Sequence, residues 1–168
     1  MIKVGIITAS DKGSKGERED RSGLVIAEMV RERGWEVTDY VILPDEREEL
    51  ASQMKQWCDT EYVDLILTTG GTGFSPRDYT PEATLDIIER NVPGIPEAMR
   101  YYSLQITPRA MLSRSVAGIR KKTLIINLPG SPKAVRENLE SIIDSLTHGI
   151  GILKGSSSEC AMPEKKNG

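Results

Sequence analysis

Residues 65–82 read LILTTGGTGFSPRDYTPE: a short apolar run, a glycine-rich loop and the start of a helix. The apolar run Leu65–Thr69 has the composition of a buried strand. Three glycines follow within four positions, and they let the backbone approach a ligand closely with its N–H groups turned outward. Such a loop at the carboxyl end of a strand is where α/β proteins hold an anion, most often a phosphate. A tight turn is the alternative, but it explains only the glycines and not the threonines, arginine and aspartate that follow.

The same alternation of strand and helix runs along the rest of the chain. We expect strands at Val4–Thr8, Val37–Leu43, Leu65–Thr69 and Thr123–Leu128, and helices at Leu24–Arg33, after Asp45, from Thr80, from Glu97 to Gln105 and from Pro132. This order predicts an α/β fold, a three-layer α/β/α sandwich around a mainly parallel sheet. Residues 1–154 then form a single domain. Residues 155–168 are Ser-rich and then contain Lys and Pro without an apolar period, so we expect a flexible C-terminal tail.

Three helix starts are marked by capping residues. Asp45-Glu46-Arg47-Glu48 has the form of a capping box, which makes Asp45 the expected N-cap. Thr80 is expected to cap the next helix, with Pro81 at its first position. Ser131 and Pro132 repeat that arrangement at the last helix.

Composition excludes several classes of protein. The net charge of −3 argues against broad nucleic-acid binding, which needs a basic surface. No apolar run approaches the ~20 residues needed to cross a bilayer, and the strand-like N-terminus shows no signal-peptide pattern. We therefore expect a cytoplasmic protein without membrane or nucleic-acid partners. Cys58 and Cys160 match no metal spacing, and a single histidine, His148, leaves no material for a triad or a zinc site.

Two further turns join the glycine loop at one edge of the predicted sheet. Ser10–Gly13 follows the first strand, and Pro129–Lys133 follows the last one. The carboxyl ends of parallel strands meet at one edge, so all three turns can face a common crevice. The last turn also brings a helix N-terminus, with its partial positive charge, to that edge. Lys133 opposes the helix dipole there, which makes more sense if an anion binds nearby, and solvent exposure is the alternative explanation.

Two aspartates at the same edge have open roles. For Asp45, local sequence favours a plain N-cap over a place in a site. Asp78 begins no predicted helix, and a carboxylate beside a phosphate loop repels the ligand unless a divalent metal lies between them. We interpret Asp78 as a Mg²⁺ ligand or as a group that orients the ligand. Four arginines alternate with glutamates and are interpreted as a solvated helix face: Arg18, Arg21, Arg31 and Arg33.

Taken together, these motifs resemble the molybdopterin adenylyltransferase family of molybdenum-cofactor biosynthesis. The resemblance runs from residue 6 through the last helix, and Tyr79 stands where the family often has a small aliphatic residue. It is carried by Ile6–Asp11, Thr68–Gly73, Pro76–Thr84, Leu112–Arg114, Gly118–Arg120 and Leu128–Lys133.

The resemblance implies an activity and a set of site residues. Such enzymes transfer AMP from Mg-ATP to the terminal phosphate of molybdopterin, release pyrophosphate, work as trimers and hand the product to a molybdate-inserting protein. Carried over by motif, Asp45 and Asp78 are the catalytic carboxylates and the Mg²⁺ ligands. The residues expected to bind molybdopterin or nucleotide are Ser10, Asp11, Thr69, Gly70, Gly71, Thr72, Gly73, Arg77, Pro129, Gly130, Ser131 and Lys133.

Three alternative functions remain at this point, and the least specific of them is a generic phosphate-binding regulatory module. The related molybdate-inserting activity is usually found in larger proteins with extra domains, which 168 residues cannot hold. A non-catalytic molybdopterin carrier would keep the fold and lose turnover, and the presence of both Asp45 and Asp78 argues against it.

Overall fold

The structure is a computed structural model that describes residues 1–156 of the chain. Of the predicted tail, residues 155–168, all but the first two residues lie outside the described part of the chain, and so does Cys160. The strands are β1 Lys3–Ala9, β2 Glu36–Leu43, β3 Leu65–Thr69, β4 Arg90–Asn91, β5 Ala117–Arg120 and β6 Thr123–Leu128. The helices are α1 Asp11–Ser14, α2 Arg21–Glu32, α3 Arg47–Asp59, α4 Thr80–Ile87, α5 Gly94–Leu104, the 3-10 helix η1 Pro108–Leu112 and α6 Pro132–Leu153. Within the described part of the chain, no helix has the length and apolar character needed to cross a membrane.

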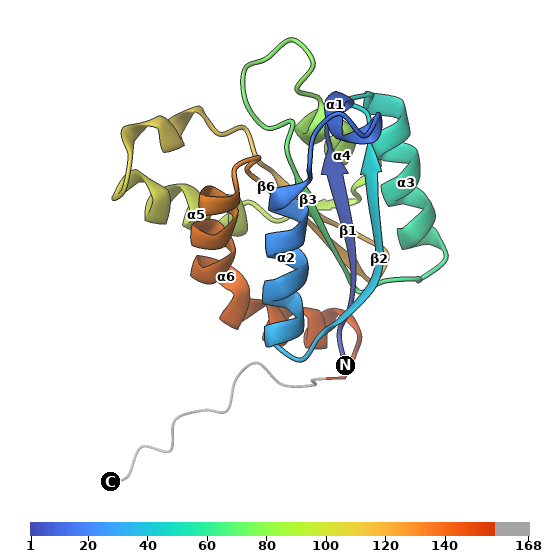
Figure 1. Cartoon of the computed structure of the whole chain (residues 1–168). Coiled ribbons are helices and arrows are strands. Elements are labelled where there is room, and N and C mark those ends of the chain that lie inside the picture. Colours follow the sequence, from blue (N-terminus) through green and yellow to red (C-terminus); the bar gives the residue numbers. More distant parts are fainter. Residues whose placement is uncertain (157–168) are drawn as a thin grey trace, which may run out of the picture.

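The strands form one six-stranded sheet in the order β2-β1-β3-β6-β5-β4 (Figure 1). The four strands β2, β1, β3 and β6 are parallel, whereas β5 and β4 pair antiparallel at one edge. In the parallel part Thr8 is in register with Thr69, and Thr69 with Leu128. The turns that follow β1, β3 and β6 therefore open side by side at one edge of the sheet.

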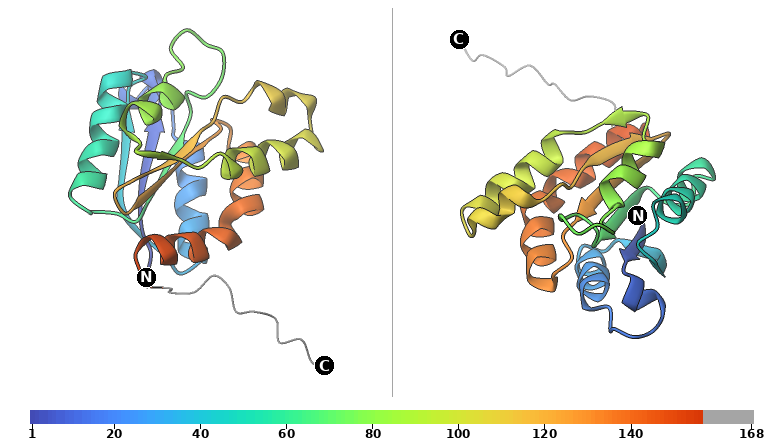
Figure 2. Two further views of the ribbon diagram at one scale, coloured as in Figure 1. Left: turned by 180° about the vertical axis from the view of Figure 1, so that it is seen from behind. Right: turned by 90° about the horizontal axis from the view of Figure 1, so that it is seen from above.

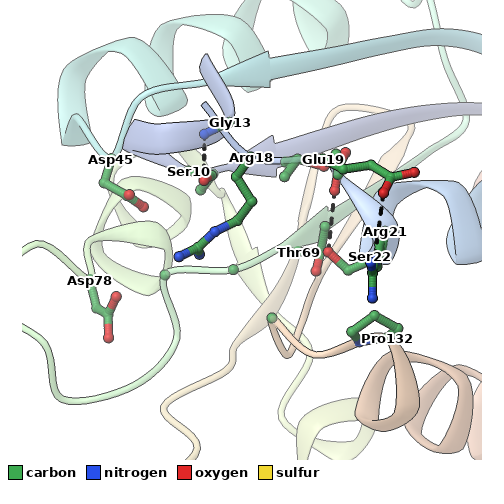
Figure 3. Close-up of a pocket in the computed structure, with 16 residues that line it drawn as sticks. Ser10, Gly13, Arg18, Glu19, Arg21, Ser22, Asp45, Thr69, Asp78 and Pro132 are labelled. Carbon is green, nitrogen blue, oxygen red and sulfur yellow. Dashed lines mark hydrogen bonds and ion pairs between the residues drawn. The ribbon is translucent and has the colours of Figure 1, made fainter. Parts of the chain in front are cut away.

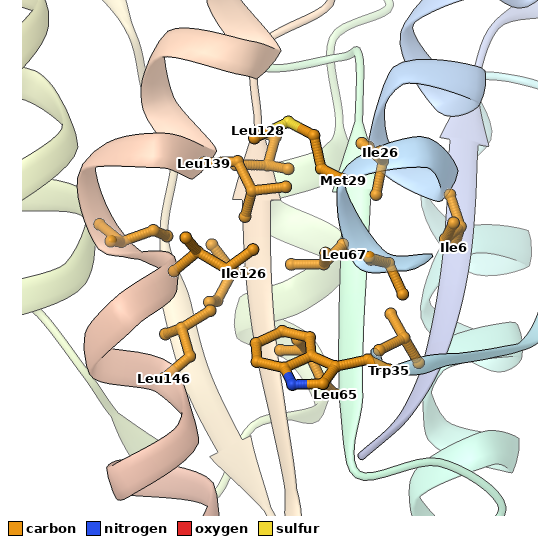
Figure 4. Close-up of a cluster of buried hydrophobic side chains, with 14 of the residues drawn as sticks. Ile6, Ile26, Met29, Trp35, Leu65, Leu67, Ile126, Leu128, Leu139 and Leu146 are labelled. Carbon is orange, nitrogen blue, oxygen red and sulfur yellow. The ribbon is translucent and has the colours of Figure 1, made fainter. Parts of the chain in front are cut away.

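Helices cover both faces of the sheet, which confirms the predicted three-layer α/β/α class (Figure 2). The larger core lies on the face covered by α2, α5 and α6 (Figure 4). The smaller core lies under α3 and α4. Both depend on aliphatic side chains: Ile6, Ile7, Leu65, Leu67, Ile125 and Ile126 are fully buried. Full burial of one such side chain contributes about 1.5–3 kcal/mol.

Of the three predicted helix caps, one is confirmed and two are wrong. Ser131 Oγ accepts a hydrogen bond from the Ala134 N–H at 3.2 Å and caps α6 as expected. α3 begins at Arg47 after Glu46, because the Asp45 carboxylate accepts a bond from another turn. α4 begins at Thr80 itself, and Thr80 Oγ1 is buried without a hydrogen-bond partner among the described residues.

Asn127 on β6 is the central polar group of the buried sheet. Its Nδ2 donates to Thr68 Oγ1 at 3.1 Å and to Thr84 Oγ1 at 2.9 Å, and its Oδ1 accepts from the Val116 N–H at 3.2 Å. Asn127→Ala leaves these buried groups without their partner, so we expect a loss of about 2 kcal/mol in the free energy of unfolding. Urea titration measures this loss, and Asn91→Ala on the exposed strand β4 is the control. Equal stability of the two variants would contradict the assignment.

Candidate functional site

A cavity of about 530 Å³ lies where the turns after β1, β3 and β6 meet (Figure 3). Its size lies within the range of small-molecule sites, which occupy roughly 300–1,000 Å³. The predicted site residues that line it are Ser10, Thr69, Gly70, Gly71, Gly130, Asp45 and Asp78. The predicted site residues outside its lining are Asp11, Thr72, Gly73, Arg77, Pro129, Ser131 and Lys133.

The glycine loop has a backbone shape that strains any residue with a Cβ atom. Gly70 and Gly71 have φ values of +87° and +70°, in the left-handed region that favours glycine. A Cβ on Gly70 would lie 2.5 Å from the carbonyl oxygen of Ala9, and a Cβ on Gly71 would collide with Thr80 Oγ1. The loop therefore presses closely against β1 on one side and the start of α4 on the other.

Hydrogen bonds hold the loop from both ends. Thr69 Oγ1 donates to the Pro129 carbonyl at 2.6 Å, which joins the turn after β3 to the turn after β6. Arg114 Nε donates to the Gly73 carbonyl at 2.7 Å, and its Nη2 donates to the Asp78 carbonyl at 2.8 Å. Thr72 also contributes through its backbone, because its carbonyl accepts the Arg114 N–H at 2.9 Å. Arg114 belongs to a motif of the resemblance, but no role could be assigned to it from the sequence.

Asp11 and Asp45 bind each other's backbone. Asp45 Oδ2 accepts from the Asp11 N–H at 2.9 Å, and the Asp45 N–H donates to Asp11 Oδ1 at 3.0 Å. This reciprocal pair connects the turn after β1 to the turn after β2. Burial raises the pKa of Asp45, and the nearby charges of Asp11 and Asp78 act in the same direction. The Arg77 guanidinium, in contrast, holds the pKa of the Asp11 carboxyl below its usual value.

Asp78 faces the same cavity as Asp45 from the loop before α4 (Figure 3). Its Oδ2 accepts from the Ser75 N–H at 2.9 Å, which sets the direction of the carboxylate. Among residues 1–156, no cluster of three or more His, Cys, Asp or Glu side chains is arranged to hold a metal ion. Two carboxylates suit Mg²⁺ nevertheless, because Mg²⁺ in nucleotide enzymes commonly takes one or two carboxylates and completes its shell with phosphate oxygens and water.

The two cations expected to bind phosphate have other partners. Arg77 Nε donates to Asp11 Oδ2 at 2.7 Å, and Arg77 Nη2 donates to Glu46 Oε1 at 2.7 Å. Lys133 is largely exposed, and its Nζ lies 3.8 Å from Glu137 Oε1. Neither Arg77 nor Lys133 lines the cavity, so their predicted role in phosphate binding finds no geometric support.

Residues 18–22 line the cavity in their place. Arg18 and Arg21 are exposed, as the sequence predicted, but Arg18 precedes the helix. Asp20 caps α2 by accepting the Gly23 N–H at 3.0 Å. Its other oxygen accepts hydrogen bonds from Thr8 Oγ1, at 2.6 Å, and from the Tyr40 hydroxyl. The segment follows β1 at the same sheet edge as Ser10. The reasoning that placed Ser10 at this edge, because it follows β1, could therefore also have placed residues 18–22 there.

Asp45→Asn is expected to stabilise the unliganded protein. A raised pKa means that the folded state disfavours the ionised carboxyl, so ionisation lowers stability once the pH exceeds the ordinary value. Asparagine removes this cost, and its amide oxygen can still accept the Asp11 N–H. The melting temperature of the variant should exceed that of the native protein at pH 7, and the difference should shrink as the pH falls. A lower melting temperature at pH 7 would contradict the assignment.

Comparison with known proteins agrees with this architecture. Residues 5–148 match the family described as the probable molybdopterin binding domain. The chain is 43% identical over 157 residues to the molybdopterin adenylyltransferase of Helicobacter pylori strain J99, covering 92% of this chain and 89% of that protein. It is also 44% identical to gephyrin of Dictyostelium discoideum over 96% of this chain, but it spans only 24% of that longer protein.

Solved structures show the same relationship. The molybdopterin biosynthesis enzyme MoaB of Thermus thermophilus superimposes with a TM-score of 0.87 at 50% identity, covering 92% of this chain and 98% of that one. The tungsten cofactor synthesizing protein MoaB of Pyrococcus furiosus gives a TM-score of 0.82 at 35% identity, over 94% of this chain and 98% of that one. The chain therefore belongs to the molybdopterin-binding family of molybdenum-cofactor biosynthesis proteins, the family that includes the molybdopterin adenylyltransferases.

Proposed function

We propose that the protein is a molybdopterin adenylyltransferase, which transfers AMP from Mg-ATP to the terminal phosphate of molybdopterin. The observation that carries this proposal is a cavity that combines a glycine loop with two carboxylates, Asp45 and Asp78, at the carboxyl edge of the sheet. The identity of 43% to a molybdopterin adenylyltransferase over most of both chains supports the choice of reaction.

The reaction needs charge neutralisation more than proton transfer. An oxygen of the terminal phosphate of molybdopterin attacks the α-phosphorus of ATP, the bond from that phosphorus to the β-bridging oxygen breaks, and pyrophosphate leaves with the electron pair. The attacking phosphate monoester has a second pKa of about 6, so at neutral pH it is mostly a dianion and needs no general base. The difficulty is to bring this dianion in line with a tetra-anionic triphosphate.

The site residues suit that task. Gly70 and Gly71 line the cavity close to Ala9 and Thr80, and their N–H groups would bind phosphate oxygens. Asp45 and Asp78 would hold Mg²⁺, which supplies positive charge to the triphosphate when it is bound. The α6 N-terminus at Pro132 adds the positive end of a helix dipole to the same cavity.

Some features of the proposal concern the protein beyond its site. We place it in the cytoplasm as a homotrimer whose product passes to a molybdate-inserting protein. Size-exclusion chromatography with light scattering distinguishes a trimer from the 18.6 kDa monomer.

The test is pyrophosphate release from Mg-ATP, measured with and without added molybdopterin. Release that depends on molybdopterin, together with an adenylated product of the expected mass, supports the adenylyl transfer. Binding of molybdopterin in a titration calorimeter without ATP consumption would instead show the carrier function.

A further inference from the structure

The cavity contains more acidic than basic side chains, although its proposed ligands are polyanions. The charged residues in its lining are Glu19, Asp20, Asp45, Asp78, Arg18 and Arg21. A site that binds a triphosphate and a phosphate monoester needs positive charge to balance their negative charge. The partners of each basic side chain therefore decide which one is available to a ligand.

One arginine in the lining is left without a partner. Arg21 Nε lies 3.5 Å from Glu19 Oε2, so its charge is already opposed. Arg77, outside the lining, is held by Asp11 and Glu46. Arg18 has no hydrogen bond or ion pair within residues 1–156, although four carboxylates line the same cavity. Its guanidinium can bind a ligand without breaking an existing contact.

The chain around Arg18 places its side chain in the cavity. Arg18 lies on the connection between α1 and α2, and Figure 3 shows the side chain extending from there toward the side occupied by Asp45 and Asp78. The connection is anchored at both ends. The Glu17 N–H donates to the Lys12 carbonyl at 2.9 Å, and the Asp20 carboxylate caps α2. Only Arg18 and Glu19 lie between these anchors, so the backbone at Arg18 is held in place beside the cavity while its side chain is exposed to a ligand.

We propose that Arg18 binds the phosphate oxygens of the nucleotide and neutralises the charge that moves onto pyrophosphate as it leaves. This inference rests on the adenylyl transfer proposed above. A guanidinium suits the task because its planar fork donates two parallel hydrogen bonds to a phosphate and keeps its charge at any working pH. Arginines that act on phosphoryl transfer in this way contribute large rate factors in nucleotide enzymes. Arg18 thereby takes the role that was predicted for Arg77 and Lys133.

The experiment compares Arg18→Ala, Arg18→Lys and Arg31→Ala. Arg31 is exposed on α2 and outside the cavity, so its loss changes the net charge equally and serves as the control. We expect Arg18→Ala to weaken the affinity for magnesium pyrophosphate, measured by calorimetry, on the order of tenfold. We expect kcat/KM for pyrophosphate release to fall on the order of 10²-fold. Arg18→Lys should lie between Arg18→Ala and the native protein, and millimolar guanidinium should partly restore the rate of Arg18→Ala alone.

The outcomes separate this inference from the proposed function. Native-like affinity and turnover in Arg18→Ala would overturn the inference and leave the adenylyl transfer intact. A lower melting temperature in Arg18→Ala without rescue by guanidinium would show a structural role and overturn it as well. If the native protein releases no pyrophosphate but its affinity for magnesium pyrophosphate depends on Arg18, the phosphate-binding role of Arg18 stands, whereas its role toward the leaving group and the proposed function both fail.

Discussion

Asp78→Asn should lower molybdopterin-dependent pyrophosphate release by at least two orders of magnitude, on the order of 10²–10³-fold. The substitution removes one negative charge and keeps nearly the same shape. The amide oxygen can still accept the Ser75 N–H that orients the native carboxylate at 2.9 Å. The loss of pyrophosphate release therefore measures the effect of the negative charge on Asp78 and does not come from a change in the loop. Steady-state rates over a range of magnesium concentrations measure it.

The control for this variant is Asp144→Asn. Asp144 is an exposed residue of α6 whose Oδ1 accepts from Arg33 Nη1 at 2.7 Å, and it lies outside the cavity. Exposed ion pairs contribute little to stability, so this variant should retain both fold and activity. If Asp78→Asn kept full turnover at every magnesium concentration, Asp78 would have no part in holding the metal.

Gly70→Ala is expected to have the largest effect on stability and to abolish ligand binding as well. Alanine at φ +87° costs about 1–2 kcal/mol on backbone grounds alone. The new Cβ would also lie 2.5 Å from the Ala9 carbonyl oxygen, which is backbone and cannot rotate away. We expect the free energy of unfolding to fall by roughly 2–4 kcal/mol. The loop must also move, so calorimetry should detect no binding of magnesium pyrophosphate.

Two other glycines separate the causes. Gly34 has a φ of +73° with open space around it, so Gly34→Ala reports the backbone strain without the collision. Gly149 lies inside α6 with nothing near its missing Cβ, and Gly149→Ala should stabilise the protein by about 0.5–1 kcal/mol. Urea titrations should give the highest free energy of unfolding for Gly149→Ala, a lower value for Gly34→Ala and the lowest for Gly70→Ala. Equal stability of the last two would show that the Ala9 contact is unimportant.

Sequence predicted the central strands well because each carries its own signal. β3 and β6 are continuous buried runs, and the predicted bounds Leu65–Thr69 and Thr123–Leu128 match the structure. The short strands β4 and β5 have two and four residues, too few to show a period, and they were missed.

The site was predictable in outline but not in its connections. The edge of the sheet and the glycine loop follow from the order of strands and turns along the chain. The partner of Asp45 does not, since Asp11 lies 34 residues away and its N–H competes with the local cap. Arg18 was assigned to a surface helix because alternating charges are typical of one. Only the position of α2, which begins at Arg21, shows that Arg18 precedes it.

The strand order also determines at which stage of chain synthesis the site can form. β1, β3 and β6 are neighbours in the sheet but end at residues 9, 69 and 128. Nearly the whole domain must leave the ribosome before the turn after β6 can close against the glycine loop. Parallel pairing between such distant segments folds slowly, because the chain loses much entropy before the contacts form. Substrate can therefore stabilise only the finished domain, and an N-terminal fragment that ends before β6 should be unable to compete for ATP.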